Sequence, residues 1–386
     1  KTILDLTHAF VEAASQAGHT KSKDLNGAQP EGVGYSQMTR KGRLRGSTAQ
    51  TFLKQAKKRQ NLRVETNATV SKLIFEGKKC VGVKFFKHGK EKFIKAAKEV
   101  ILSGGAVNSP HILQVSGIGP SDHLMNIGIN VVHHLPGVGA NLQDHYVARV
   151  SHRVRHAKSI NSLSRGTNLL KEIATWAFSG KGALTFGVTS AMVFSRSREG
   201  LSSPDLQLLF TPASYSERTL GKLEQEDGMT VAVCPVRPAS RGTIMAVSSD
   251  PFVRPEIRPN YLSDPDDVRV LLAGIHQTRE IFSQPALQRY SSKETAPGIQ
   301  IQTSEELENF ARNNGSIIYH PVSTCRMGDD EMAVVDPRLR VRGIKGLRVV
   351  DASIMPTVTT GNTNAPTIMI AEKASDMILE DARHAA

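Results

Sequence analysis

The hydrophobic pattern of the sequence changes from a strand period to a helix period between positions 62 and 119, and this change limits the possible folds most strongly. Apolar and polar residues alternate in LRVETNATVSKLIFEG, CVGVKFFK and FIKAAKEVILS, a pattern typical of strands. Gly77 and Gly89 predict turns between these strands. The last strand ends at Gly104 and Gly105, where a helix of roughly ten residues is predicted to begin. We therefore expect a mixed α/β or α+β fold.

Apolar residues at helical spacing predict further helices. They are expected at 1–18, in a segment that Ser47 would cap, at 264–283 and at 304–313. From 151 to 310 the chain instead has short β-rich segments bounded by proline and glycine. The strand or loop candidates in this region are WAFSGKGALTFG, PDLQLLF, TVAVCPVRP and RGTIMAVSS. They predict an antiparallel sheet backed by helices, as a separate layer.

The charge distribution and the lack of long apolar runs exclude some classes of protein. The net charge is +13, but lysine and arginine are spread along the chain, and no aromatic residues are interleaved with the basic runs at 54–60 and 87–92. A solvated basic surface is favoured, and no nucleic-acid partner is expected. No window approaches the roughly eighteen apolar residues of a membrane span, and the first residues lack the order of a secretion signal. We expect a cytoplasmic protein, and peripheral contact with the inner face of a membrane is left open.

The reactive side chains do not form a metal-binding or serine-hydrolase motif. Cys80, Cys234 and Cys325 lie far apart without CxxC spacing, which fits a reducing compartment and indicates neither a disulfide framework nor a metal cluster. His133 and His134 are adjacent, so on a strand they would point to opposite sides. No serine has glycines two positions away on both sides, as a GxSxG motif requires. We expect no bound metal and no hydrolase chemistry.

Longer motifs occur in a fixed order along the chain. They are GGAVNSPHILQVSGIGP (104–120), LPGVGANLQDH (135–145), YHPVSTCRMG (319–328) and GLRVVDASIMPTVTTGNTNAPTIMIAEKASDMI (346–378). Together they resemble the glucose–methanol–choline oxidoreductases, flavin enzymes that oxidise alcohols. The resemblance covers essentially the whole chain and is weakest in the middle. It implies an incomplete FAD-binding Rossmann-like domain and a substrate domain with an antiparallel sheet backed by helices.

The resemblance implies two catalytic residues. His320 takes the position of the family's catalytic histidine, and Asn362 takes the position of its partner. An imidazole can accept the hydroxyl proton that must leave when a hydride is taken from the alcohol carbon. An amide can hold the developing alkoxide oxygen without competing for that proton. The expected reaction is oxidation of a primary alcohol to the aldehyde, with hydride transfer to flavin N5.

The resemblance also implies contacts with FAD. A helix is predicted to start at Pro366, and its N-terminus favours an anion because it carries unpaired N–H groups and about half a positive charge. It would face the pyrimidine end of the flavin, with Asn364 in the pocket floor; the alternative is that Asn364 is only an N-cap. Asp351 and Ala352 match positions near the ribityl and phosphate atoms. Val70 matches a residue whose backbone meets the adenine.

The substrate pocket is less well defined by the resemblance. Asn141 and His145 belong to a motif on the flavin side, with a structural turn as the alternative for both. Choline-specific relatives need a carboxylate or an aromatic cage for the quaternary ammonium, and Ser190 stands at the nearest match to such a glutamate. An uncharged primary alcohol is therefore favoured, and choline is the alternative. The electron acceptor is left open among oxygen, a quinone and another carrier.

One family feature is missing from the sequence. Members carry GxGxxG between a strand and a helix to hold the FAD pyrophosphate, and EGVGYS at 31–36 lacks that spacing. We expect the chain to be the C-terminal portion of a longer protein. The FAD-binding domain is predicted at 38–150 and 320–386, and the substrate domain at 1–37 and 151–319. The alternative function is a non-catalytic fragment, or a subunit that supplies the substrate side to a separate flavin-binding chain.

Overall fold

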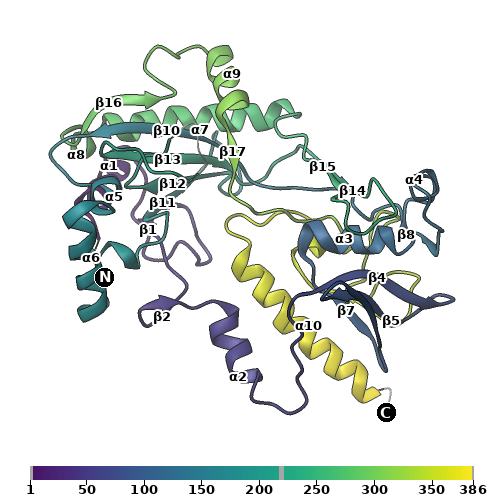
Figure 1. The fold of residues 1–386 in the computed structure, drawn as a ribbon. Coiled ribbons are helices and arrows are strands. Elements are labelled where there is room, and N and C mark those ends of the chain that lie inside the picture. The colour runs from purple at the N-terminus through teal and green to yellow at the C-terminus, as the bar shows by residue number, and fades with distance from the viewer. Residues whose placement is uncertain (1–2, 217–220, 385–386) are drawn as a thin grey trace. The chain divides into compact units, whose positions relative to one another are not determined.

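The computed structural model describes residues 3–216 and 221–384, which divide into two compact units (Figure 1). Unit 1 comprises Lys1–Val64, Tyr146–Val236 and Pro265–Ser316, and unit 2 comprises Glu65–His145, Arg237–Asp264 and Ile317–Ala386. Each unit is assembled from stretches of chain that are far apart in the sequence.

The units and the predicted domain ranges differ in two long segments, 38–64 and 237–264, and in two short ones, 146–150 and 317–319. Residues 38–64 belong to unit 1, where the indole N–H of Trp176 donates to the carbonyl of Arg43. Residues 237–264 belong to unit 2, where the side chain of Gln114 donates to the carbonyl of Ile244 at 3.0 Å. These long-range contacts are not visible in local sequence patterns. The FAD-binding and substrate-binding roles of the two domains stay predictions.

An antiparallel sheet forms the centre of unit 1. Its strand order is β1 (Gly32–Tyr35), β11 (Ala191–Ser195), β12 (Leu206–Thr211), β13 (Gly228–Pro235), β10 (Tyr146–Val154) and β16 (Ser291–Ala296), and β17 (Ser316–Ile317) pairs with β10. Every residue of β12 is buried, as expected for a central strand covered on both faces. The predicted antiparallel sheet is confirmed.

Helices pack against this sheet. Helix α7 (Pro265–Ser283) contacts β10, β12 and β13, and α1 (Asp5–Gln16) contacts β1, β11 and β12. Gly274 allows the close approach of α7, because a Cβ there would lie 2.4 Å from Cγ1 of Val233. Phe10 of α1 stacks on Phe210 with ring centroids 4.3 Å apart. Unit 1 also contains α5 (Ile160–Leu163), α8 (Pro285–Gln288), α9 (Ser304–Asn314) and the 3₁₀ turn η2 (Ala183–Thr185). The helices predicted at 264–283 and 304–313 are thus confirmed. The helix predicted at 1–18 forms over Asp5–Gln16, and positions 1 and 2 lie outside the described residues.

The prediction of a strand or loop for WAFSGKGALTFG was wrong at its start. WAFS forms the end of α6 (Gly166–Ser179), and the helix stops at Gly180, whose φ of 67° is left-handed. No residue of α6 is buried. Its apolar residues therefore do not belong to a buried strand of the sheet. PDLQLLF and TVAVCP, in contrast, form β12 and β13 as predicted.

The helix that Ser47 was expected to cap begins differently. A π-helix (Ala49–Leu53) is followed by the short α2 (Lys54–Ala56), and no side-chain cap is present at either start. Ser47 contributes its backbone carbonyl instead, which accepts from the amides of Gln50 and Thr51. The hairpin of β2 (Arg40–Lys41) and β3 (Leu44–Arg45) precedes this segment.

Unit 2 contains the alternating segments that were predicted as strands. β4 (Ala68–Glu76), β5 (Lys79–Lys87) and β6 (Lys90–Lys95) form a three-stranded antiparallel sheet. Gly77 and Gly89 make the two turns with φ values of 58° and 71°, a conformation that glycine adopts without strain. The two predicted turns are confirmed.

The third predicted strand divides into two strands of different sheets. β6 ends at Lys95, and β7 (Val100–Leu102) pairs in parallel with β18 (Leu347–Val349). Alternation alone could not show this division, because the partner of β7 comes from a distant part of the chain. Helix α3 (Gly105–Val115) directly follows β7, as predicted.

Helix α10 (Asn364–His384) is tied to the parallel strands by a buried arginine. Arg348 is 3% exposed, and its guanidinium binds Glu99 at 2.8 Å and Asp381 of α10 at 2.5 Å. Such partners are needed to offset the cost of burying the charge. The other elements of unit 2 are α4 (Ser121–Asn126), β8 (Ile118–Gly119), β9 (His133–His134), β14 (Thr243–Met245), β15 (Glu256–Arg258) and η3 (Ala352–Ile354).

Membrane crossing requires a long helix of mostly apolar residues. None of the helices formed by residues 3–216 and 221–384 meets both conditions.

Candidate functional site

Backbone contacts hold the segment before His145 against the loop that carries His320. Gly139 donates its N–H to the carbonyl of Thr324 at 2.8 Å. The φ of Gly139 is 84°, and a Cβ there would lie 2.2 Å from the carbonyl oxygen of Ile244, so this position requires glycine. The close approach brings His145 beside His320, although 175 positions separate them in the sequence.

The backbone around His320 is unusual. Tyr319 has a φ of 62° and Ser323 a φ of 75°, in the left-handed region that few residues other than glycine adopt. His320 between them is 7% exposed, whereas Tyr319 is 66% exposed. A backbone of this kind persists where neighbouring groups fix it. The loop therefore holds the imidazole inside unit 2 in a defined position.

Asp144 is one of the groups that fix this loop. Its Oδ1 accepts from the backbone N–H of His320 at 2.8 Å and from that of His145 at 2.7 Å. Its Oδ2 accepts from the hydroxyl of Tyr261 at 3.0 Å. Burial raises the pKa of the Asp144 carboxyl, and these hydrogen bonds oppose that shift because they favour the charged form. One buried carboxylate thus joins three separate segments.

The two predicted catalytic residues lie together. Asn362 Nδ2 is 3.1 Å from Nε2 of His320, and the other ring nitrogen, Nδ1, is 2.9 Å from Nδ1 of His145. The two imidazole rings meet edge to face, with centroids 5.1 Å apart and an interplanar angle of 81°. His320 is therefore held at both nitrogens by residues of the predicted site.

These contacts fit one tautomer of the neutral His320 ring. An amide NH₂ group only donates, so Nε2 of His320 accepts from Asn362 and carries no proton. In the neutral ring this arrangement fits a proton on Nδ1, which can donate to Nδ1 of His145. The lone pair of Nε2 points toward Asn362, the exposed side of the pair. This nitrogen is the one that can take a proton from a substrate.

Burial lowers the pKa of His320 from 6.5 to about 4, because the charged imidazolium would lose its hydration. The ring is therefore neutral near pH 7 and available as a base.

The same shift predicts a pH dependence of stability. The folded state binds fewer protons than the unfolded chain between pH 6.5 and about 4, so the contribution of His320 is complete above pH 6.5 and is lost as the pH falls toward 4. The full contribution is about 3 kcal/mol. We expect His320→Gln to remove this part of the acid sensitivity, measured as the change in the free energy of unfolding in urea between pH 7 and pH 5. An equal pH dependence of stability in the unmodified protein and in His320→Gln would contradict this prediction.

Gln143 and Asn141 hold the loop that leads to Asn362. Gln143 Nε2 donates to the carbonyl of Pro356 and to Oγ of Ser323, both at 3.2 Å, and its Oε1 accepts from the N–H of Val358 at 3.2 Å. Asn141 Nδ2 donates to the same Pro356 carbonyl at 3.3 Å, from a residue with a φ of 61°. A flavin contact of Asn141 stays a prediction.

Helix α10 begins two residues earlier than predicted, at Asn364, and Pro366 lies in its first turn. The carbonyl of Thr363 accepts from the N–H of Thr367 at 3.0 Å, so the amides before Thr367 precede the first helical hydrogen bond. The first turn contains no acidic residue. This donor set fits an anionic group such as a phosphate or a reduced flavin. Contacts of Asn364 and Pro366 with FAD stay predictions.

Asp351 has a defined structural role at the end of β18. Its Oδ2 accepts from the N–H of Gly105 at 2.9 Å and from Oγ of Ser109 at 2.5 Å, and its Oδ1 accepts from the N–H of Ser353 at 2.8 Å. The carboxylate therefore caps the positive end of α3. Ala352 follows as the first residue of η3. Their predicted proximity to the ribityl and phosphate atoms is not tested by these contacts.

Two predicted site residues, Val70 and Ser190, are distant in the sequence from His320 and Asn362. Val70 is a half-buried residue of β4 opposite Phe85. Ser190 belongs to unit 1, where its hydroxyl lies 2.9 Å from Oγ1 of Thr7. The residue also lines a small apolar pocket together with Phe186. The adenine contact of Val70 and the substrate contact of Ser190 stay predictions.

Sequence reasoning did not single out Gln143, Asp144 or Tyr261. The first two lie inside the LPGVGANLQDH motif, so the motif itself was a signal for them. Tyr261 has no such signal, because its role depends on a contact with a residue 117 positions away.

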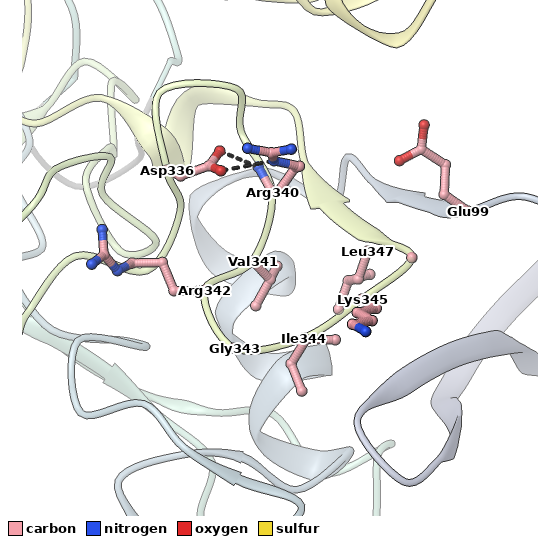
Figure 2. Close-up of a pocket in the computed structure, with 10 residues that line it drawn as sticks. Glu99, Asp336, Arg340, Val341, Arg342, Gly343, Ile344, Lys345 and Leu347 are labelled. Carbon is pink, nitrogen blue, oxygen red and sulfur yellow. Dashed lines mark hydrogen bonds and ion pairs between the residues drawn. The ribbon is translucent and has the colours of Figure 1, made fainter. Parts of the chain in front are cut away.

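A cavity of about 600 Å³ in unit 2 does not contain the predicted site residues. It is lined by residues 340–347 together with Glu99 and Asp336, and the guanidinium of Arg340 binds the carboxylate of Asp336 (Figure 2). Among residues 3–216 and 221–384, no cluster of three or more His, Cys, Asp and Glu side chains is placed to hold a metal ion.

Comparison with known proteins identifies the class. The chain is 45% identical over 376 residues to an oxygen-dependent choline dehydrogenase of Pectobacterium carotovorum. The matched region covers 97% of this chain and 67% of that protein. It is 43% identical over 386 residues to the human mitochondrial choline dehydrogenase, covering 98% and 64%. An FAD-dependent oxidoreductase of Chaetomium thermophilum has the same fold, with a TM-score of 0.86, 25% identity and coverage of 98% and 72%. The class is that of FAD-dependent oxidoreductases acting on CH–OH groups.

The family follows from the sequence itself. Two sequence models of the GMC (glucose–methanol–choline) oxidoreductases match residues 2–147 and 238–371. The chain belongs to the GMC oxidoreductase family, and the resemblance drawn from its motifs is confirmed. It spans about two thirds of the length of the curated relatives that it matches.

Proposed function

We propose that unit 2 carries the alcohol-binding and base residues of an FAD-dependent alcohol dehydrogenase, with His320 as the general base and Asn362 as the donor to the alcohol oxygen. The supporting observation is the distance of 3.1 Å between Asn362 Nδ2 and His320 Nε2. An alcohol oxygen that replaced this hydrogen bond could accept from the amide and donate to the imidazole. FAD, the family's cofactor, supplies the hydride acceptor when bound.

The two residues divide the work of removing a proton and a hydride from one alcohol. The O–H bond breaks as the proton passes to the lone pair of His320 Nε2, and the C–H bond breaks as the hydride leaves, so that an aldehyde remains. Asn362 stabilises the negative charge that develops on the oxygen. The lowered pKa of His320 keeps Nε2 unprotonated before the reaction.

Choline is the substrate that the relatives favour, since two of them with 45% and 43% identity are choline dehydrogenases. The residue type at Ser190 supports the alternative, an uncharged primary alcohol, because a hydroxyl cannot neutralise a quaternary ammonium. The name of the Pectobacterium relative points to oxygen as acceptor for that protein. We propose choline as the substrate and leave oxygen and a quinone as the acceptors to be compared.

The substrate test uses the FAD-loaded protein under anaerobic conditions. Choline is compared with its uncharged isostere, in which a tert-butyl group replaces the trimethylammonium group. We expect choline to bleach the flavin absorbance with at least about tenfold higher kcat/KM, because recognition of the cation is worth 1–2 kcal/mol. Equal efficiency would show that the substrate is an uncharged alcohol. Bound FAD that neither alcohol reduces would instead support the non-catalytic alternative.

A further inference from the structure

Gln143, Asp144 and His145 each hold a different part of the reacting pair. Gln143 binds the loop 356–358 that leads to Asn362. Asp144 binds the backbone of His320, and His145 binds the ring of the same residue. All of these atoms lie in unit 2, and all three side chains are at least nine-tenths buried. Consecutive residues of one segment therefore position both the base and the oxyanion donor.

The contribution of His145 differs from that of its two neighbours, because it acts on the protonation of the base. Its Nδ1 lies 2.9 Å from Nδ1 of His320 and is available as an acceptor only while its own ring is protonated at Nε2 alone. In that state it takes the hydrogen bond from Nδ1–H of His320. While His145 keeps its proton on Nε2, the competing tautomer of His320, with the proton on Nε2, would point two unprotonated Nδ1 atoms at each other and lose this bond. The reverse bond, from Nδ1–H of His145, would require both rings to change tautomer together.

The same contact matters when His320 accepts the substrate proton. Both ring nitrogens then carry hydrogen, and the ring is a buried cation. The Nδ1–H donor to His145 becomes a charge-assisted hydrogen bond, which is stronger than the neutral one. The arrangement is comparable in logic to the carboxylate that orients a catalytic histidine in a serine-protease triad, with an imidazole as the orienting group.

We propose that His145 is a positioning residue that keeps the proton of neutral His320 on Nδ1, so that Nε2 faces the substrate as the base. This inference rests on the proposed role of His320. It gives His145 a role different from the flavin or pocket contact expected from the sequence.

The first test reads the tautomer directly and requires no turnover. ¹⁵N-histidine-labelled protein is compared with His145→Leu, and the His320 signals are assigned by their loss in His320→Gln. In the unmodified protein we expect Nδ1 of His320 to show the shift of a protonated nitrogen and Nε2 that of an unprotonated one. In His145→Leu we expect the His320 tautomer with the proton on Nε2 to become populated or to predominate. An unchanged tautomer in that variant would overturn the proposal.

The second test measures anaerobic flavin reduction by choline in the FAD-loaded protein. We expect His145→Leu to lower the limiting rate of reduction about tenfold or more with little change in the substrate concentration for half-maximal rate. His145→Asn, whose side-chain oxygen can accept the same bond, should recover most of the rate. His134→Leu, which removes an exposed histidine of the same unit, is the matched control and should change neither measurement.

The two tests separate this inference from the proposed function. A changed tautomer with an unchanged reduction rate would show that His320 is not the base. An unchanged tautomer with a normal rate would leave the base intact and remove His145 from its role. Failure of His145→Asn to recover the rate, with its tautomer preserved, would show that the hydrogen bond is not what the reaction needs.

Discussion

Replacing His320 by glutamine is expected to slow the reduction of bound FAD by an alcohol about a hundredfold or more, because the hydroxyl proton loses its acceptor. Glutamine is similar in length and can still donate to and accept from neighbours, so the loss should appear in the limiting rate rather than in FAD binding. The measurement is anaerobic stopped-flow bleaching of the flavin. A rate that is not diminished would remove His320 as the base.

A control for this prediction comes from a smaller side chain at the same position. In His320→Ala, imidazole added to the solution can occupy the vacated space and accept the proton, and a partial return of the rate would identify proton transfer as the missing step. Imidazole should have no effect on the glutamine variant, where the space is filled.

Replacing Asp144 by alanine is expected to have the largest effect on stability. Three donors would lose their acceptor, two of them the backbone amides of His145 and His320. Buried groups left without partners cost about 1–3 kcal/mol each, so we expect a loss of roughly 3–5 kcal/mol in the free energy of opening at this site. The measurement is hydrogen exchange of the His145 and His320 amides. Protection within about 1 kcal/mol of the unmodified protein would contradict the structural role.

Two milder variants separate the contributions of the individual Asp144 hydrogen bonds to stability. Asp144→Asn keeps an oxygen for the two amides and changes only the group facing Tyr261, so it should cost less than the alanine variant. Tyr261→Phe removes one hydrogen bond and should cost about 1 kcal/mol.

Local patterns predicted the elements whose partners are close in the sequence. The alternation and the turns at Gly77 and Gly89 predicted β4 and β5, and helical spacing predicted α7 and α9. The same reasoning joined β6 and β7 into one strand, because the parallel partner of β7 is supplied by residues 347–349. It also missed α6, none of whose residues is buried.

The catalytic pair could be predicted only through the family resemblance of its motifs, since His320 is one of 13 histidines. Its surroundings could not be derived in this way. The contact of Asp144 with His320 spans 176 positions, and its existence depends on two left-handed residues, Tyr319 and Ser323, whose conformation no residue type in the sequence demands. The motifs pointed to His320 and Asn362, and the arrangement of their neighbours became visible only in the structure.

The parallel pairing of β7 with β18 has a consequence for biosynthesis. Pairing between residues 100–102 and 347–349 must wait until the ribosome has released residues 347–349, whereas the β4–β5–β6 meander can form long before. For that interval the apolar edge of β7 is without its neighbour strand. The nascent polypeptide is therefore open to wrong strand pairing at β7 for longer than at the meander.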